Sequence, residues 1–331
     1  MEGLLIALGL AAVFYIAWCI GANDAANPTS CAVGAGVLSL KKALCLFAAF
    51  ASLGALLQGY MVMKTLGKGV VPSVDPVGAF TTALAAGLWI ALCTYFGLPI
   101  STSQSITGAV VGYGLAAFGL GGVRWELMVR IVASWLTSPL SAMVVTALLF
   151  KLLAKLIERG LLGERCTKLL LIASLCFSAY SFGANDVGNS TGVMLTVVGG
   201  LGTLESWLLT AWGALGIVVG GFTWGYRVIR TVAYKITHLD PYSGVAAGIS
   251  NALVVYLFTV VPYALIGYGM PISTTHASVS SVMGAGLARG REVDWRTVAF
   301  ILCSWLLTVP TTALISLTMY RLAASFTPPY P

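Results

Sequence analysis

The sequence carries little charge. Only 9% of its 331 residues are Asp, Glu, Lys or Arg, whereas 58% are hydrophobic. A soluble domain carries about 25% charged residues. This shortage excludes a water-soluble globular protein and indicates an all-α, polytopic membrane protein. The first apolar run has no basic region before it and no small-residue cleavage site after it, so we interpret it as a retained membrane span.

Signals of several other function classes are missing. The seven cysteines show no metal-ligand spacing and lie mostly in apolar runs, where cysteine behaves as a small hydrophobe. The sequence shows no cofactor motif, no Ser with a convincing base and no Glu beside a metal-ligand pair, which argues against an enzyme. The formal charge of +7 comes from basic residues spread over loops. Such residues fit membrane orientation better than nucleic-acid binding.

Apolar runs organise most of the chain. Runs long enough to cross a membrane contain about 17–25 residues, and they cover residues 4–20, 43–63, 77–96, 127–150, 207–229, 243–268 and 297–320. Shorter pieces, interrupted by Gly, Pro, Ser and Thr, cover residues 28–40, 97–120, 183–201 and 269–288. Non-helical backbone at membrane depth is tolerated only inside protein or beside a water-filled cavity. We therefore expect the functional site at the interrupted pieces.

One polar motif occurs twice, each time after an apolar run. Residues 21–27 read Gly-Ala-Asn-Asp-Ala-Ala-Asn, and residues 183–189 read Gly-Ala-Asn-Asp-Val-Gly-Asn. An acid at the bilayer centre costs roughly 3 kcal/mol on insertion scales, so it normally faces a cavity and has a function. The Gly before and the Pro or Gly after each motif should weaken the helix and free backbone carbonyls.

Carboxylate, carboxamide and carbonyl oxygens together suit a hard cation such as sodium. The candidate sodium ligands are Asn23, Asp24, Asn185 and Asp186. Asn27 and Asn189 lie four residues after the first Asn of each motif and share its helix face, so they join the candidate substrate-binding residues. The alternative is that these Asn side chains only bond helix to helix. Two copies that each contain an Asp favour a functional site.

A second motif is also duplicated. Residues 98–104 read Leu-Pro-Ile-Ser-Thr-Ser-Gln, and residues 270–276 read Met-Pro-Ile-Ser-Thr-Thr-His. Proline favours the first turn of a helix, whose unpaired N–H groups and positive dipole end attract anions. The predicted oxyanion ligands are Ser101, Thr102, Ser103, Gln104, Ser273, Thr274, Thr275 and His276. The alternative is that the Ser and Thr side chains only cap helices, and for His276 a structural hydrogen bond is favoured over a proton carrier.

The motifs recur in the same order and divide the chain into two halves. A third pair of landmarks, Trp135 with Pro139 and Trp305 with Pro310, follows them. We predict a first inverted repeat (1–157), a short basic connector (158–168) and a second inverted repeat (169–331) that meet at a midplane site through broken helices and re-entrant hairpins. The connector should be cytoplasmic and both termini outside. The nine tryptophans lie mostly near span ends, so we assign them to the interfacial belt, without a site role.

These residues carry a family resemblance. The motifs at 21–27, 183–189 and 271–276 resemble signatures of the inorganic phosphate transporter family, and the chain is similar to a short prokaryotic-type member. The resemblance implies a multi-pass protein of the cell membrane that carries inorganic phosphate in symport with sodium or a proton, needs no other cofactor, and commonly forms a homodimer in the lipid. The Asn, Asp, Ser and Thr residues named above would line its phosphate and cation sites.

The resemblance leaves the anion open. The loop between the halves is shorter than in many members, and short sulfate permeases carry a hairpin like residues 101–104. Phosphate keeps a proton at pH 7 and needs an acceptor, whereas sulfate needs only donors. Asp24 and Asp186 supply acceptors, which favours phosphate. A sulfate permease of the same fold is the alternative, and a cation exchanger is less favoured because it would not need the Pro-Ile-Ser-Thr donors.

Overall fold

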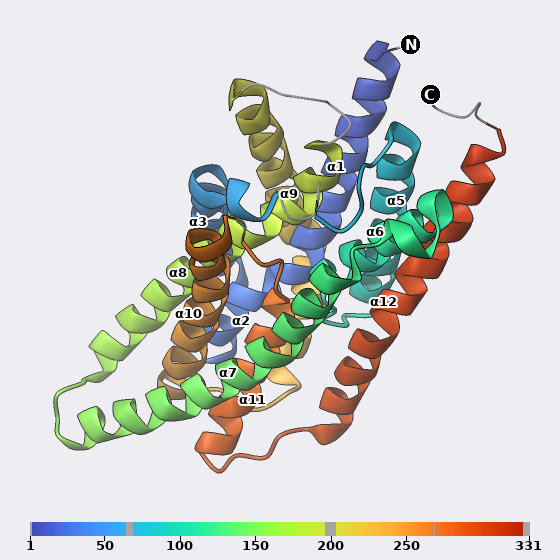
Figure 1. Ribbon diagram of the computed structural model, residues 1–331. Helices are drawn as coiled ribbons and strands as arrows, with labels where there is room; N and C mark the ends of the chain where they lie inside the picture. Colours follow the sequence, from blue (N-terminus) through green and yellow to red (C-terminus); the bar gives the residue numbers. More distant parts are fainter. Residues whose placement is uncertain (1, 64–68, 196–202, 268, 327–331) are drawn as a thin grey trace.

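The computed structural model describes residues 2–63, 69–195, 203–267 and 269–326 (Figure 1). These residues form helices joined by turns, without a strand in the described ranges. The helices are α1 (Glu2–Asp24), α2 (Ala26–Gly34), α3 (Leu40–Gln58), α5 (Pro76–Tyr95), α6 (Thr102–Phe118), a 3₁₀ turn η1 (Leu120–Gly122), α7 (Trp125–Glu158), α8 (Glu164–Leu195), α9 (Thr203–Tyr234), α10 (Pro241–Ile266), α11 (Thr274–Ala288) and α12 (Trp295–Ala324).

The membrane-spanning segments match the apolar runs. Among the described residues, 8 helices are long and apolar enough to cross a membrane. Seven of them overlap the runs predicted from the sequence, and α8 is the eighth. The start of α1 and the end of α12 lie at one end of the molecule, and the turn between α7 and α8 lies at the other (Figure 1). Residues 159–163, between these helices, fall inside the predicted connector.

The expected helix breaks at the Asn-Asp motifs are only partly present. In the first motif α1 gives way to α2 around Ala25, and Pro28 removes the N–H that would bond the Asp24 carbonyl. The second motif lies inside a continuous helix of 32 residues, α8. The prediction that residues 183–201 are too interrupted for a simple span is therefore wrong for the described part up to Leu195, because a lone Gly188 weakens a buried helix without breaking it.

Each half packs on the other through the corresponding pair of helices, with the two halves interchanged. Helix α1 packs against α9 as α8 packs against α3, and α6 packs against α12 as α11 packs against α7. The glycine that opens each Asn-Asp motif allows this approach. A Cβ on Gly21 would overlap the Ile217 carbonyl of α9, and a Cβ on Gly183 would overlap the Ala51 carbonyl of α3. The duplicated glycines thus set how closely the motif helices approach the other half.

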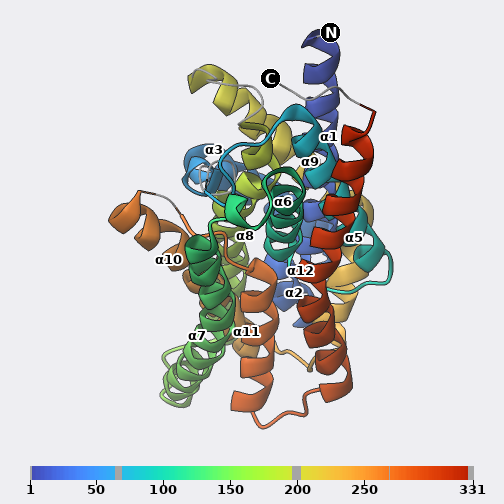
Figure 2. The ribbon, with the colours of Figure 1, turned by 45° about the vertical axis from the view of Figure 1, so that its right-hand side comes forward.

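Two hairpins bring the Pro-Ile-Ser-Thr motifs to the centre. Helices α5 and α10 begin alike, because Asp75 and Asp240 cap their first turns and are each followed by Pro. After α5 and α10 the chain turns back into α6 and α11. Figure 2 shows α6 extending toward the end that holds the termini and α11 toward the connector end. The N-termini of α6 and α11 therefore meet in the middle of the molecule from opposite sides.

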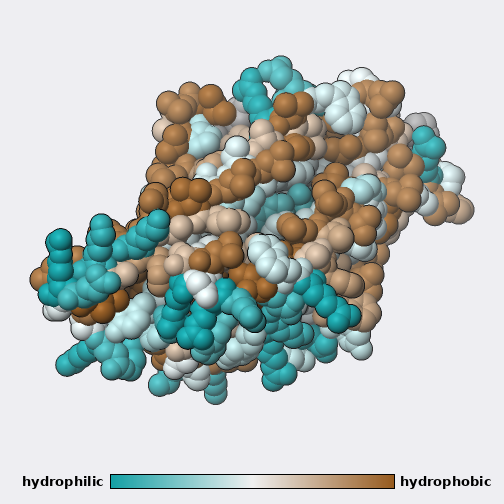
Figure 3. All heavy atoms as spheres, turned by 90° about the horizontal axis from the view of Figure 1, so that it is seen from below, coloured by the Kyte–Doolittle hydropathy of each residue, from teal (hydrophilic) through white to brown (hydrophobic). Residues whose placement is uncertain are grey.

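The connector end carries much of the hydrophilic surface. Figure 3 looks onto this end and shows hydrophilic side chains gathered along it. Exposed basic residues there come from the α3 start, the α7–α8 turn and the segment before α12, among them Lys42, Arg159, Arg165 and Arg291. This placement is what a cytoplasmic connector end would require, since basic residues accumulate on the cytoplasmic side.

Candidate functional site

Both acids meet at one hydroxyl. Thr102, the first residue of α6, donates through Oγ1 to Asp24 Oδ2 at 2.6 Å and lies 3.5 Å from Asp186 Oδ1. Thr275 of α11 donates to the other Asp24 oxygen, Oδ1, at 3.0 Å. Both carboxylates are fully buried, at 0% exposure. The two duplicated motifs therefore form a single site, as the sequence predicts.

The second asparagine of each motif lies in the same cluster. Asn27 donates through Nδ2 to the hydroxyl oxygens of Thr274 and Thr275, each at 3.2 Å. Asn189 donates through Nδ2 to Asp186 Oδ1 at 2.9 Å. Three buried oxygens here accept a hydrogen bond from no described residue: Asn27 Oδ1, Asn189 Oδ1 and Asp186 Oδ2. Bare carboxylate and carboxamide oxygens are ligands that a hard cation prefers.

The first asparagine of each motif instead holds a hairpin. Asn23 Nδ2 donates to Thr94 Oγ1 at 2.8 Å and to the Leu98 carbonyl at 3.0 Å, while its Oδ1 accepts from Ile100 N at 3.1 Å. These three bonds use both amide hydrogens of Asn23 and one of the two lone pairs of its oxygen. Its side chain thus fixes the α5–α6 turn, and a direct role as an ion ligand stays a prediction.

Asn185 makes the matching contacts in the second half. Its Nδ2 donates to Thr259 Oγ1 at 2.7 Å and to the Met270 carbonyl at 3.0 Å. Its Oδ1 has no donor among the described residues. Asn185 therefore holds the α10–α11 turn and still has one oxygen available to a cation.

Three serines of the hairpins have structural hydrogen bonds. Ser101 Oγ accepts from Gln104 N at 3.2 Å, and Ser273 Oγ accepts from His276 N at 3.1 Å. The cap interpretation therefore holds for these two serines. Ser103 donates to the Ile272 carbonyl at 2.5 Å and so ties the two hairpins together. The caps occupy the N–H groups of Gln104 and His276. The N–H groups before them in the first turns of α6 and α11 have no intrahelical acceptor, so an anion could accept from them.

Two tryptophans contradict their assignment to the interfacial belt. Trp135 of α7 and Trp305 of α12 are buried, with 4% and 7% exposure. Trp135 Nε1 donates to the Pro271 carbonyl at 3.2 Å, and Trp305 Nε1 donates to the Pro99 carbonyl at 3.0 Å. Each half thus braces the hairpin of the other half. A belt tryptophan would lie at a span end, whereas these lie about one-third of the way along their helices.

His276 is also held by these tryptophans. Its ring stacks on Trp305 with centroids 3.8 Å apart, and Nδ1 lies 3.1 Å from the Trp135 carbonyl. Because a carbonyl only accepts, Nδ1 carries the hydrogen and Nε2 is the acceptor in the neutral ring. The structural hydrogen bond expected for His276 is present. The Oε1 atom of Gln104, its repeat partner, has no donor among the described residues.

The charge balance of the site is negative. The buried polar and charged residues include Asp24, Asp186 and His276 but no Lys or Arg among those described. Nor do the described residues contain a group of three or more His, Cys, Asp or Glu side chains suited to a metal ion. The oxygen set therefore fits a monovalent hard cation better than a transition metal.

Several residues around the site lie outside the motifs found in the sequence. Thr94 and Thr259 each follow the Asp-Pro start of their helix by 19 residues, and this fourth repeated landmark could have revealed them. Asn251 of α10 is 3% exposed and donates through Nδ2 to the Asn27 carbonyl at 3.2 Å and to Ser178 Oγ at 2.8 Å. In the sequence, only its position as a lone Asn within the apolar run 243–268 indicates a buried polar role for Asn251.

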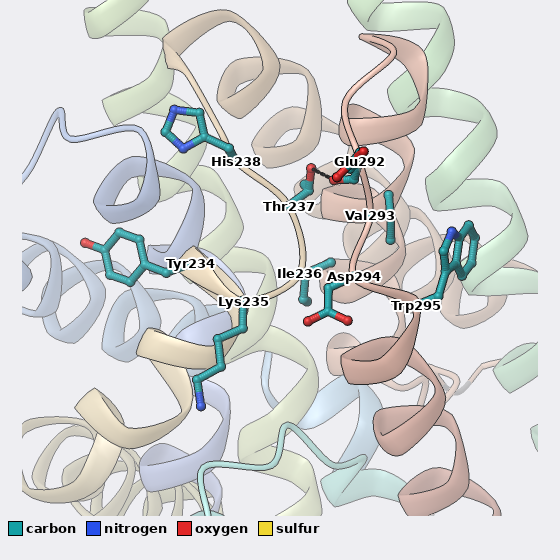
Figure 4. Close-up of a pocket in the computed structure, with 9 residues that line it drawn as sticks. All are labelled: Tyr234, Lys235, Ile236, Thr237, His238, Glu292, Val293, Asp294 and Trp295. Carbon is teal, nitrogen blue, oxygen red and sulfur yellow. Dashed lines mark hydrogen bonds between the residues drawn. The ribbon is translucent and has the colours of Figure 1, made fainter.

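A surface pocket between the α9–α10 and α11–α12 loops is a poorer candidate. It measures about 450 Å³ and is lined by Lys235, His238, Glu292 and Asp294 among others. Figure 4 shows His238 and Lys235 pointing in different directions, so the basic groups do not converge on one ligand. Hydrogen bonds from the Thr297 backbone and hydroxyl hold the pKa of Asp294 below its ordinary value, which fits its role as the α12 cap.

Comparisons with known proteins show the family to which the chain belongs. The family model described as the phosphate transporter family matches residues 20–163 and 162–316. A candidate phosphate permease of Pyrococcus horikoshii is 32% identical, covering 94% of this chain and 96% of its own length. A chloroplastic inorganic phosphate transporter of Arabidopsis thaliana is 28% identical, covering 92% and 69%. The solved structure of a protein named as a sodium-dependent phosphate transporter superposes with a TM-score of 0.87 at 30% identity, covering 98% of this chain and 100% of the other.

Proposed function

The chain belongs to the phosphate transporter family, and from this premise we propose that it is a secondary active transporter that takes up inorganic phosphate in symport with a cation. The observation that carries the proposal is the meeting of Asp24 and Asp186 at Thr102, the first residue of a hairpin helix. Carboxylates and an anion-binding helix N-terminus occupy one buried space. Cation and anion would therefore bind as neighbours.

Electrostatics then couples the two ions. Two buried carboxylates without a buried Lys or Arg among the described residues repel a phosphate anion. A cation bound to the acids removes this repulsion and adds attraction. By linkage, phosphate raises cation affinity by the same factor. The empty carrier and the fully loaded carrier are the favoured states, which is what symport needs.

Sodium is the cation that we propose. The bare oxygens of Asn27, Asn189 and Asp186 form a ligand set for a hard cation, with hydroxyl oxygens beside them. The solved relative is named as sodium-dependent, which supports the same ion here. A proton is the alternative, since either acid could carry one.

Phosphate is favoured over sulfate by the same residues. The first turns of α6 and α11 offer N–H donors, and the acids and His276 Nε2 offer acceptors for the phosphate hydroxyl. Sulfate has no hydroxyl, so a buried acceptor facing it would be left unpaired at a cost of about 1–3 kcal/mol. The relatives named above are phosphate carriers by name, and the sulfate alternative is not favoured.

Movement of the halves would expose the site to each side in turn. We propose that residues 1–157 and 169–331 are inverted repeats that rock about the central site. The exchanged packing of α1 on α9 and α8 on α3 supports this relation. Homodimer formation stays a prediction from the resemblance.

Uptake into proteoliposomes tests the proposal. Purified protein is reconstituted, and labelled phosphate or sulfate uptake is measured with a sodium gradient or a pH gradient imposed separately. We expect phosphate uptake driven by the inward sodium gradient and little sulfate uptake. Asp294→Asn, which changes an exposed acid outside the site, controls for purification and reconstitution and should transport as the wild type does. Sulfate uptake without phosphate uptake, or exchange of sodium without either anion, would refute the proposal.

A further inference from the structure

A second buried polar cluster lies beside the central site. Asn251 of α10 bonds to the Asn27 carbonyl at 3.2 Å and to Ser178 Oγ of α8 at 2.8 Å. Ser278 of α11 donates to the same Asn27 carbonyl at 3.1 Å. We call Ser178, Asn251 and Ser278 the connector-side cluster. All three are at most 3% exposed.

The cluster lies between the central site and the connector end. Ser178 precedes Asp186 by eight residues along α8, or about 12 Å of helix rise toward the connector. Ser278 is one turn beyond Thr274 along α11, which runs to the connector end (Figure 1). Asn27 joins the two sites, because its side chain contacts Thr274 and its carbonyl contacts the cluster. A phosphate leaving the central site toward the connector end would meet this cluster next.

The fold does not require polar side chains at these positions. When the two repeats are aligned on their shared motifs, each member of the cluster has a counterpart in the first repeat. The counterparts are Ile16 for Ser178, Ala86 for Asn251 and Ile106 for Ser278. All three counterparts are buried and apolar. The first repeat therefore builds the same helix packing with apolar side chains at these three positions.

The hydrogen-bonding pattern also argues against simple helix-to-helix bonding. Asn251 Oδ1 is buried and accepts from no described residue, and Ser281 Oγ, one turn further along α11, has no described partner. Groups that only join helices would be expected to satisfy all their atoms. The first repeat has partnerless buried hydroxyls of its own, at Thr82 and Thr107, but they are not bonded to a site residue in the described contacts.

We propose that the connector-side cluster is a second, transient binding site for phosphate on its way between the central site and the connector end; this rests on the proposed transport function. When phosphate enters, Asn251 Nδ2 and the Ser278 hydroxyl exchange their bonds to the Asn27 carbonyl for bonds to the anion, and Asn251 Oδ1, which has no described donor, accepts from the phosphate hydroxyl. Because these donors carry no charge, they bind phosphate weakly and release it toward the connector end. The termini side, with its apolar counterparts, lacks such a site.

Two variants that each remove a polar side chain from the connector-side cluster test the proposal. Asn251→Ala introduces the residue of the first repeat, and Ser278→Ala removes one donor. Equilibrium phosphate affinity is measured by calorimetry in saturating sodium, and maximal uptake is measured in proteoliposomes. We expect affinity to stay within twofold and maximal uptake to fall at least fivefold. Thr82→Ala, which removes a partnerless hydroxyl from the first repeat, should leave both unchanged.

The outcomes separate this proposal from the transport function. Wild-type protein without phosphate binding or uptake would refute the function itself. If the wild-type protein takes up phosphate and the Asn251→Ala and Ser278→Ala variants do so at the same maximal rate, only the proposal of a second site is refuted. An affinity loss as large as the uptake loss would also refute it, because the cluster would then belong to the central site.

Thiol labelling provides a test that does not depend on transport. Ser278→Cys and its matched control Ile106→Cys are placed in a background whose seven native cysteines are replaced, and a charged thiol reagent is applied in detergent. We expect Ser278→Cys to react at least tenfold faster, and saturating phosphate to slow its reaction. Equal rates at the two positions, or no effect of phosphate, would overturn the proposal.

Discussion

Removing one acid should uncouple sodium from phosphate. The Asp24 and Asp186 oxygens lie 2.6 and 3.5 Å from Thr102 Oγ1, so the carboxylates and the first turn of α6 are all within roughly 6 Å of one another. Unit charges roughly 6 Å apart interact by about 3 kcal/mol at an effective dielectric constant of about 20. This energy corresponds to about a 100-fold change in affinity.

We therefore expect saturating sodium to tighten phosphate binding about 100-fold in the wild-type protein and less than about tenfold in Asp186→Asn. The variant removes the charge that holds one cation but keeps the side-chain shape. The assay is calorimetric titration of phosphate in sodium or choline chloride at equal ionic strength.

Asp294→Asn is the matched control for this experiment. It makes the same chemical change at an exposed cap of α12, where Asn also caps well, so it should keep the full sodium dependence. If Asp186→Asn retains the roughly 100-fold effect of sodium while folding normally, the electrostatic account of coupling is wrong.

Three further outcomes follow from the same geometry. Thr102→Ala or Thr274→Ala should weaken phosphate affinity about tenfold without abolishing it, since a hydrogen bond to a charged group contributes about 1.5–3 kcal/mol and the backbone N–H groups remain; calorimetry that shows unchanged affinity for both would leave them structural roles only. Asn23→Ala should destabilise the protein by about 2–4 kcal/mol, because three hairpin bonds are lost, and an unchanged melting temperature would count against the hairpin role. In intact cells, an impermeant thiol reagent should label Pro328→Cys but not Gly160→Cys, and the reverse pattern would invert the predicted topology.

The sequence was sufficient for the fold class and for the identity of the central motifs. Low charge and long apolar runs predict the spans, since a bilayer admits little else. The duplication predicts that Asp24 and Asp186 lie together, and the structure places both carboxylates beside the Thr102 hydroxyl; that they bind ions stays a prediction. Such inferences succeed because an intramembrane acid, repeated with its neighbours, has few structural explanations.

The different contacts of the two asparagines in each motif could not be predicted from the sequence. Spacing places Asn23 and Asn27 on one helix face, yet Asn23 bonds to the α5–α6 turn and Asn27 faces α11. Which way each carboxamide points depends on contacts with distant helices. Likewise, Trp135 looks like a belt residue in sequence, and only the packing of α7 on α11 brings its Nε1 to a hairpin carbonyl.

A structure determined with sodium and phosphate bound would test the central claim most directly. We predict the anion between the first turns of α6 and α11, within hydrogen-bond distance of Thr102 or Thr274, with sodium in contact with Asp24 or Asp186. Phosphate bound instead in the surface pocket at residues 234–238, or sodium bound away from both acids, would contradict the account.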